Sequence, residues 1–213
     1  MIDILLLTDL HGQYGNLDSF LNIDADMIFI AGDLTNFGPV EPVKEILSQI
    51  DVPCFVIPGN CDPKELISVL ESSNGVCLHG VSMEIGRITI TGAGGSNPTP
   101  FDTPFELTEE EIDRIIEHAT ENTKPNIHNI LLTHAPPKGY LDLAGGEHVG
   151  SESVRKHLKK FDLICCGHIH EQKGIKEVDG VTIVNPGPAF EGKCALIRLG
   201  DEPKEIEIKF LTV

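Results

Sequence analysis

A carboxylate and an imidazole stand two residues apart at the end of an apolar run near the start of the chain. The run is Ile4 to Gly12, ILLLTDLHG, and the pair is Asp9 and His11. If the strand stays extended at its end, both side chains lie on one face and can reach the same cation. Carboxylate oxygen and imidazole nitrogen together suit transition metals better than Ca. By itself, the pair is also compatible with a turn and a surface histidine.

Four further apolar runs end in side chains of the same kinds. The runs are Met27–Ala31, Cys54–Ile57, Asn129–Thr133 and Leu163–Cys166, and the polar residues after them are Asp33, Asn60, His134, His168 and His170. Short apolar runs bounded by turn residues are typical of buried strands. Open α/β sheets bind their ligands at the carboxyl ends of such strands. The pattern therefore predicts strands that deliver metal-capable groups to the binding edge of a sheet.

A helical segment follows each of the first three strands. The predicted helices are Asn16–Asn22, Glu41–Ile50 and Pro63–Leu70. In the second of them Val43, Ile46 and Leu47 recur at helical spacing. Strands that alternate with helices form βαβ units, so the sequence predicts an α/β protein with a largely parallel sheet.

The remainder of the chain continues with strands and helices. We expect a hairpin at Val81–Thr91, helices at Thr108–Glu121 and Ser151–Lys160, and strands at Val181–Val184, Cys194–Leu199 and Glu205–Phe210. Thr108 and Glu111 form a capping box at the start of the first helix. The Gly- and Pro-rich segment Gly92–Pro104 is predicted to be one surface loop, either a plain connection or a functional one. No domain boundary is evident, and residues 1–213 are predicted to form a single domain.

The charge balance excludes several classes of partner. The 213 residues include 16 Lys and Arg against 33 Asp and Glu, a net charge of −17, with no basic cluster. This argues against long nucleic acid, whose binding rests on many phosphate contacts. The acidic charge is compatible with a small phosphorylated substrate, because bound divalent metals would supply positive charge locally.

No run approaches the ~20 apolar residues of a membrane span, and MIDILLLTD is predicted to be a strand, not a signal peptide.

The cysteines are typical of a reduced protein. They are Cys54, Cys61, Cys77, Cys165, Cys166 and Cys194, and none is in C-x-x-C spacing. We expect most of them to be small buried hydrophobic residues in a cytoplasmic chain. The adjacent Cys165 and Cys166 are expected to point to opposite faces of a strand.

The order of the polar motifs resembles that of the calcineurin-like metallophosphoesterase superfamily over nearly the whole chain. The motifs are Asp9-x-His11, Gly32-Asp33, Gly59-Asn60, Thr133-His134 and Gly167-His168-x-His170. The segments GAGGS, HAPP, HVGS and NPG resemble a small prokaryotic branch of it. The resemblance implies a four-layer α/β/β/α sandwich of the metallophosphoesterase type.

The resemblance also implies a binuclear metal centre. Asp9, His11, Asp33 and His170 would hold one divalent ion, and Asp33, Asn60, His134 and His168 the other, with Asp33 bridging both. Mn is the first metal to try, with Fe, Zn or Ni as alternatives. Two cations about 3.5–4 Å apart lower the pKa of a bridging water and neutralise a phosphate. The implied activity is hydrolysis of a small phosphodiester or phosphomonoester by a metal-bridging hydroxide, with the diester favoured.

The sequence departs from the family pattern at Cys61. Many relatives have a His directly after the Asn, and that His is thought to assist substrate binding or to protonate the leaving group. A general acid contributes about 10²–10⁴-fold, and most for a basic leaving group. We therefore expect activated esters to remain better substrates than alkyl esters. His148, in a Gly-rich loop, is the candidate substitute, and a surface loop histidine is the alternative interpretation.

Other polar residues receive supporting roles or none. Asp62 is expected to order Asn60 or a nearby His. Asn185 and Gly187 either lie near the active cleft or form only a strand-ending turn. The histidines outside the motifs are expected to be surface or helix residues: His79, His118, His128 and His157.

Two alternative functions remain open at this point. Some relatives with this fold are catalytically weak scaffolds that bind other proteins, which the loss of His at Cys61 favours and the complete ligand set opposes. A nuclease of the same superfamily is disfavoured by the acidic charge. Exposed edge strands in the tail permit a homodimer, and nothing in the sequence requires one.

Overall fold

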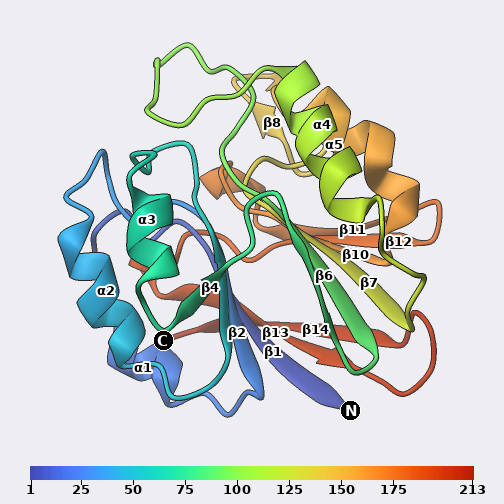
Figure 1. Ribbon diagram of the computed structural model, residues 1–213, viewed down its shortest axis with the longest axis horizontal. Helices are drawn as coiled ribbons and strands as arrows, with labels where there is room; N and C mark the ends of the chain where they lie inside the picture. Colours follow the sequence, from blue (N-terminus) through green and yellow to red (C-terminus); the bar gives the residue numbers. More distant parts are fainter.

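The computed structural model describes residues 1–213 and contains two six-stranded sheets that pack face to face between outer helices (Figure 1). In order across the first sheet, the strands are β14 (Ile206–Thr212), β13 (Lys193–Leu199), β1 (Ile2–Leu7), β2 (Met27–Ala31), β3 (Cys54–Ile57) and β4 (Gly75–Cys77). In the second sheet they are β11 (Gly174–Val178), β12 (Val181–Asn185), β10 (Leu163–Cys165), β7 (His128–Thr133), β6 (Ile88–Ala93) and β5 (Ser82–Ile85).

Five helices cover the outer faces of the two sheets. The helices α1 (Leu17–Leu21), α2 (Glu41–Ser48) and α3 (Leu66–Glu71) lie on the first sheet, and α4 (Glu109–Thr120) and α5 (Glu152–His157) lie on the second (Figure 1). A small hairpin of β8 (Leu143–Ala144) and β9 (Glu147–His148) stands apart from both sheets. None of the helices is long and apolar enough to cross a membrane.

Both sheets are mixed, with parallel strands at their centres. The strands β1, β2, β3 and β4 are parallel neighbours, and so are β6, β7, β10 and β12. The antiparallel strands β13 and β14 extend the first sheet, and β5 and β11 form the edges of the second. The expected βαβ pattern is confirmed for the central strands.

The alternation of side chains along β1 explains the four layers. Ile4 and Leu6 belong to the apolar core between the two sheets, whereas Leu5 and Leu7 pack in a second core beneath α1 to α3. A third core lies between the second sheet and α4 and α5. Because successive side chains point to opposite faces, a strand that is covered on both faces must be apolar throughout. The predicted α/β/β/α sandwich is confirmed.

The predicted helices and strands differ from the observed ones mainly where the sequence pattern is weak. The capping box of Thr108 and Glu111 at α4 is confirmed. α3 begins three residues later than the predicted Pro63. The prediction missed the edge strand β11, because its sequence GIKEV is mostly exposed and carries no apolar alternation. Its pairing with β12 rests on backbone hydrogen bonds.

One histidine prediction is wrong. His128 is fully buried at the start of β7, where its Nε2 lies 3.0 Å from the Gly200 carbonyl oxygen. This partner lies in the loop after β13 of the other sheet, 72 residues away in the chain, so local sequence gives no sign of it. His118 and His157 lie on helices as expected, although His157 is buried. His79 is partly buried, and its Nδ1 accepts a hydrogen bond from the Gly94 amide.

Candidate metal centre

The structure brings all seven predicted ligand residues to one edge of the sandwich. Each of them follows the carboxyl end of a parallel strand: Asp9 and His11 follow β1, Asp33 follows β2, Asn60 follows β3, His134 follows β7, and His168 and His170 follow β10. Parallel strands all end on the same side, so residues far apart in the chain meet there. Both sheets contribute to the cluster.

Asp9, His11 and His170 form one group of potential ligands. The Nε2 atoms of His11 and His170 are 3.2 Å apart. The Oδ1 atom of Asp9 lies 3.7 Å from the first of these nitrogens and 3.4 Å from the second. Donors at about 2.1 Å from a single ion would have such spacings. This group can therefore hold one cation.

A second group forms around His134, which is completely buried. Its Nε2 lies 2.9 Å from Oδ1 of Asn60 and 3.4 Å from Oδ2 of Asp33. Its Nδ1 lies 2.7 Å from the Ala31 carbonyl oxygen, which fixes the orientation of the ring. The ring of His168 packs edge-on against it, with 5.0 Å between centroids.

The carboxylate of Asp33 lies between the two groups. Its Oδ2 atom is 3.5 Å from Nε2 of His11 and 3.4 Å from Nε2 of His134. Its Oδ1 atom accepts a 2.8 Å hydrogen bond from the backbone amide of Cys61. One oxygen of Asp33 is thus held in place while the other faces both groups.

An unsatisfied oxygen shows that these residues fit a bound cation. Oδ1 of Asp9 is buried and has no hydrogen-bond partner. Buried polar atoms are rarely left without a partner. This oxygen is directed at the nitrogens of His11 and His170, and a cation among them would satisfy all three.

Charge interactions within the cluster shift its pKa values. Burial lowers the pKa of His134, but the carboxylates of Asp33 and Asp9 outweigh burial and raise it to about 9. Burial lowers the pKa of His168 to about 4, helped by the charge of His134. Burial raises the pKa of Asp33, but His134 and His11 hold it below its usual range. An imidazolium at His134 thus offsets buried carboxylate charge, a role that a divalent cation fulfils more completely.

Four of the seven residues have left-handed backbone conformations. The φ angles are 54° at Asp9, 47° at His11, 53° at Asp33 and 69° at His168. Residues other than glycine seldom adopt such angles, and each costs of order 1 kcal/mol. Hydrogen bonds between loops hold them, including the His11 amide to the Asp33 carbonyl at 2.8 Å. Strain of this kind concentrates at functional sites.

Comparison with known families agrees with this geometry. The family model described as calcineurin-like phosphoesterase matches residues 2–172. The chain belongs to the calcineurin-like phosphoesterase family. Within the family, it is 38% identical to protein MJ1162 of Methanocaldococcus jannaschii over 93% of this chain and 95% of that protein.

Solved structures share the fold of this phosphoesterase at low sequence identity. One reaches a TM-score of 0.83 at 18% identity, covering 99% of this chain and 98% of the other. TT1561 of Thermus thermophilus has a TM-score of 0.74 at 20% identity, with 98% of each chain covered. Vps29 of Entamoeba histolytica, solved with Zn²⁺, has a TM-score of 0.52 at 14% identity, with 99% of each chain covered.

Asp62 supports this phosphoesterase site differently from the sequence-based expectation. Its buried carboxylate forms no hydrogen bond with the Asn60 side chain or with a histidine. It accepts hydrogen bonds from the backbone amides of Leu34, Thr35 and Gly59 and from the Thr35 hydroxyl. Asp62 therefore ties the loop after β2 to the loop after β3 and fixes the spacing of Asp33 and Asn60.

Asn185 lies close to the ligand cluster, and a position near the active cleft was one of the two alternatives predicted for it from the sequence. Its Nδ2 donates to the carbonyl oxygens of Gly167 and Ile169, at 3.3 and 3.0 Å. Its Oδ1 accepts from the Gly187 amide at 2.8 Å. Asn185 and Gly187 thus also form the turn that ends β12. The two carbonyls flank His168, so this side chain positions the loop that carries His168 and His170.

Asn185→Ala is expected to weaken metal binding by about 10–100-fold, the usual cost of losing a group that orients ligands. Manganese titration of the metal-free protein by calorimetry measures this effect without any substrate. The matched control is Asn22→Ala, at an exposed position at the end of α1. Equal affinity in both variants would contradict the positioning role of Asn185.

The thiol of Cys61 lies at the edge of the cluster. Its Sγ atom falls within 4.8 Å of donor atoms of His11 and Asp33. It also lies 3.5 Å from Nδ2 of Asn60. Burial raises the pKa of this thiol, and the carboxylate of Asp33 raises it further. Cys61 therefore occupies the predicted position beside the centre as a neutral thiol.

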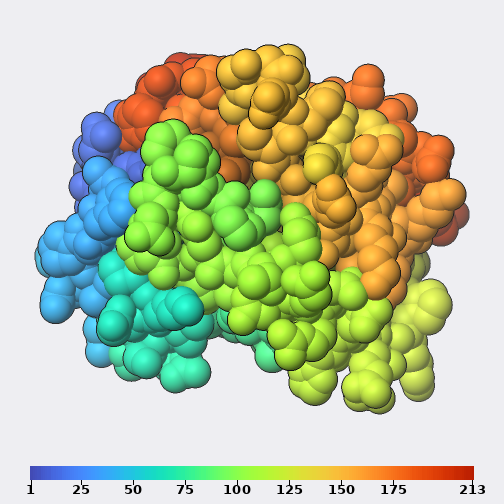
Figure 2. Space-filling view, turned by 90° about the horizontal axis from the view of Figure 1, so that it is seen from above, coloured from blue at the N-terminus to red at the C-terminus, as the bar shows by residue number.

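A cleft of about 900 Å³ opens beside His168 and His170. Its walls include the loop after β6, the β8–β9 hairpin, the loop after β10 and the first turns of α4 and α5. Figure 2 shows this face, with the green loop after β6 beside the golden hairpin segment. His148 lines the same cleft, and its side chain is 53% exposed. The predicted loop Gly92–Pro104 is thus part of the site's surroundings.

Sequence reasoning missed three residues at the site. Thr103 accepts a 3.1 Å hydrogen bond from Nδ2 of Asn60, which leaves the amide oxygen directed at His134. Phe190 packs edge-on against both His11 and His170. Asp142 holds His148. Only Asp142, six residues before His148, had a local signal that could have been noticed.

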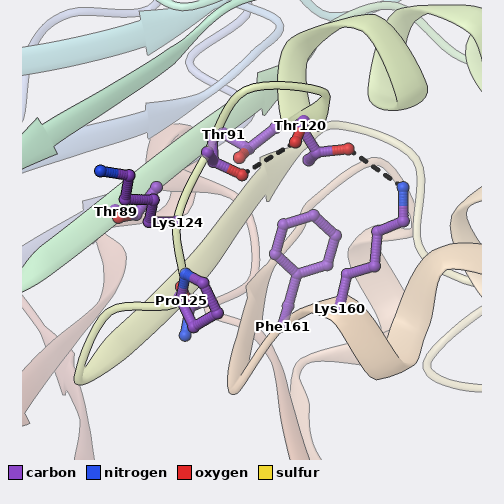
Figure 3. Close-up of a pocket in the computed structure, with 9 residues that line it drawn as sticks. Thr89, Thr91, Thr120, Lys124, Pro125, Lys160 and Phe161 are labelled. Atoms are coloured by element: carbon purple, nitrogen blue, oxygen red, sulfur yellow. Dashed lines mark hydrogen bonds between the residues drawn. The ribbon is translucent and has the colours of Figure 1, made fainter.

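Another pocket lies at the opposite end of the second sheet (Figure 3). It has a volume of about 260 Å³ and includes Thr89 and Asn129, at the starts of β6 and β7. Its Lys160 is turned toward Thr120 and donates to the hydroxyl at 3.0 Å. None of the predicted ligands lines it, so this pocket is separate from the metal centre.

Proposed function

We propose that this phosphoesterase is a dimetal hydrolase of small phosphodiesters. The observation that carries the proposal is the position of Asp33, with one oxygen about equally far from a histidine of each ligand group. A bridging carboxylate is what a pair of adjacent cations requires. When bound, such a pair lowers the pKa of a water molecule and neutralises the charge on a phosphate.

The charges of the cleft support a diester over a monoester. The lining includes four carboxylates, those of Glu109, Glu110, Glu152 and Glu171, and the single ammonium of Lys138. That ammonium is already paired with Glu152 at 2.6 Å. A phosphodiester carries one negative charge and a monoester near neutral pH carries almost two. The acidic walls therefore repel the diester less.

The residues of the cluster have separable roles in this proposal. His134, His168 and Asn60 would hold one cation, Asp9, His11 and His170 would hold the other, and Asp33 would contribute to both. The donor set of imidazole and carboxylate is compatible with Mn, Fe, Zn or Ni. Manganese is our first choice, and the zinc bound by the Vps29 relative makes zinc the second metal to try.

The test is hydrolysis by metal-stripped protein before and after metal is restored. We expect bis(4-nitrophenyl) phosphate to be hydrolysed only after Mn is added, and 4-nitrophenyl phosphate more slowly. The bound metal should be counted by elemental analysis in the same samples. Turnover of neither ester with two metals bound would overturn the proposal in favour of a protein-binding scaffold.

A further inference from the structure

We propose that His148, held by Asp142, donates the proton that the leaving group requires. This inference rests on the proposed phosphodiester hydrolysis and adds a catalytic residue and a positioning residue to it. Neither residue belongs to the ligand cluster. Both come from the segment between β7 and α5, around the β8–β9 hairpin.

Asp142 is built to hold an imidazole. Its side chain is completely buried, and its Oδ1 lies 2.6 Å from Nδ1 of His148. Its Oδ2 accepts hydrogen bonds from the backbone amides of Gly139 and Gly150, at 2.8 and 3.0 Å. Both ends of the loop are thereby tied to one carboxylate. A carboxylate fixed in this way holds the ring in one orientation and engages its Nδ1 atom.

The other ring nitrogen of His148 is free to meet a substrate. Nδ1 is engaged by Asp142, and no protein group bonds Nε2. His148 lines the cleft that also contains His168 and His170. A phosphodiester whose phosphate lies at the metal centre must extend its alcohol part into a neighbouring space, and this cleft is such a space.

Neither the other two histidines nor the lysine of the cleft suits the role of acid. His168 and His170 are predicted ligands, and the ammonium of Lys138 is paired with Glu152. The neutral thiol of Cys61, where many relatives have a histidine, is a weak hydrogen-bond donor. His148 is the remaining imidazole among the lining residues.

The step balances without any further reactant. A water oxygen forms the new bond to phosphorus and releases its proton to solvent. The bond between phosphorus and the leaving oxygen breaks, and its electron pair stays on that oxygen. The proton on Nε2 of His148 passes to the oxygen and yields the alcohol. The neutral imidazole then regains a proton from solvent.

The test compares two diesters of similar size whose leaving groups differ in basicity. Bis(4-nitrophenyl) phosphate releases a weakly basic phenolate, whereas dibenzyl phosphate releases a strongly basic alkoxide. His148→Ala in the metal-loaded protein is expected to lower dibenzyl phosphate hydrolysis by about 10²-fold or more and to change the nitrophenyl rate little. Added imidazole is expected to restore part of the lost rate. The matched control is His118→Ala, an exposed histidine on α4, which should change neither rate.

The outcomes separate this inference from the proposed function. An equal effect of His148→Ala on both diesters, including no effect, would overturn the acid role while hydrolysis itself stands. Turnover of neither diester by the wild-type protein would overturn both proposals. Asp142→Asn is expected to lower the rate of dibenzyl phosphate hydrolysis relative to that of bis(4-nitrophenyl) phosphate, by a smaller factor than His148→Ala does. A purely structural defect would lower both rates together and leave their ratio unchanged. If that variant does not fold, His148→Ala alone decides.

Discussion

Asp33→Asn is expected to lower metal-dependent diester hydrolysis by about 10³-fold or more. The amide keeps the size of the side chain but removes the negative charge that faces both ligand groups. A metal pair provides several kcal/mol of charge stabilisation in the transition state. Loss of about 4 kcal/mol corresponds to about 10³-fold in rate. We also expect the variant to bind fewer than two metal ions per chain.

The measurement pairs initial rates with metal content, both taken after saturation with Mn. The control is Asp51→Asn, because Asp51 is exposed and lies before β3, outside the site. It should retain the wild-type rate and stoichiometry. An Asp33→Asn protein that kept two metals and the full rate would exclude a bridging role for this carboxylate.

Gly59→Ala is expected to disrupt both the site and the fold around it. A Cβ atom at Gly59 would lie 2.7 Å from Cγ of Asp33 and closer still to its backbone nitrogen. The backbone cannot yield easily, because Asp62 ties the Gly59 amide to the loop after β2. Overpacking a core usually costs about 1–3 kcal/mol, and a clash with backbone should reach the upper end. Displacement of Asp33 should also weaken metal binding.

Urea unfolding of the metal-free protein measures the first effect, and manganese calorimetry measures the second. Gly15→Ala is the matched control, since an added Cβ there meets nothing within 4 Å. We expect the control to match the wild-type protein in both measurements. Wild-type stability and metal affinity in Gly59→Ala would show that the two loops are more loosely packed than the structure indicates.

The sequence predicted the elements whose signals are local. Each apolar run followed by a metal-capable residue became a parallel strand with that residue at its carboxyl end. These signals are strong because a strand covered on both faces needs apolar side chains at every position. Thr108 and Glu111 likewise marked the start of α4, since a capping box is made within one turn of helix.

Weakly patterned elements could not be predicted. β11 is an exposed edge strand, and it exists because β12 offers backbone partners. His128 is buried, and its Nε2 atom meets a carbonyl from the loop after β13 of the other sheet. Asp62 was expected to orient a side chain, but it bonds the backbone amides of two loops. In each case the partner is remote in the chain or is a backbone group, which residue types do not reveal.

The sequence by itself determined which residues are available for metal chemistry and at which strand ends they lie, because residue type and apolar patterning are local properties. Only the tertiary structure decided that one oxygen of Asp33 faces histidines of both groups, that Oδ1 of Asp9 is left without a partner, and that Asp142 holds His148. Those facts depend on how the two sheets pack against each other and on left-handed loop residues that only surrounding contacts can hold.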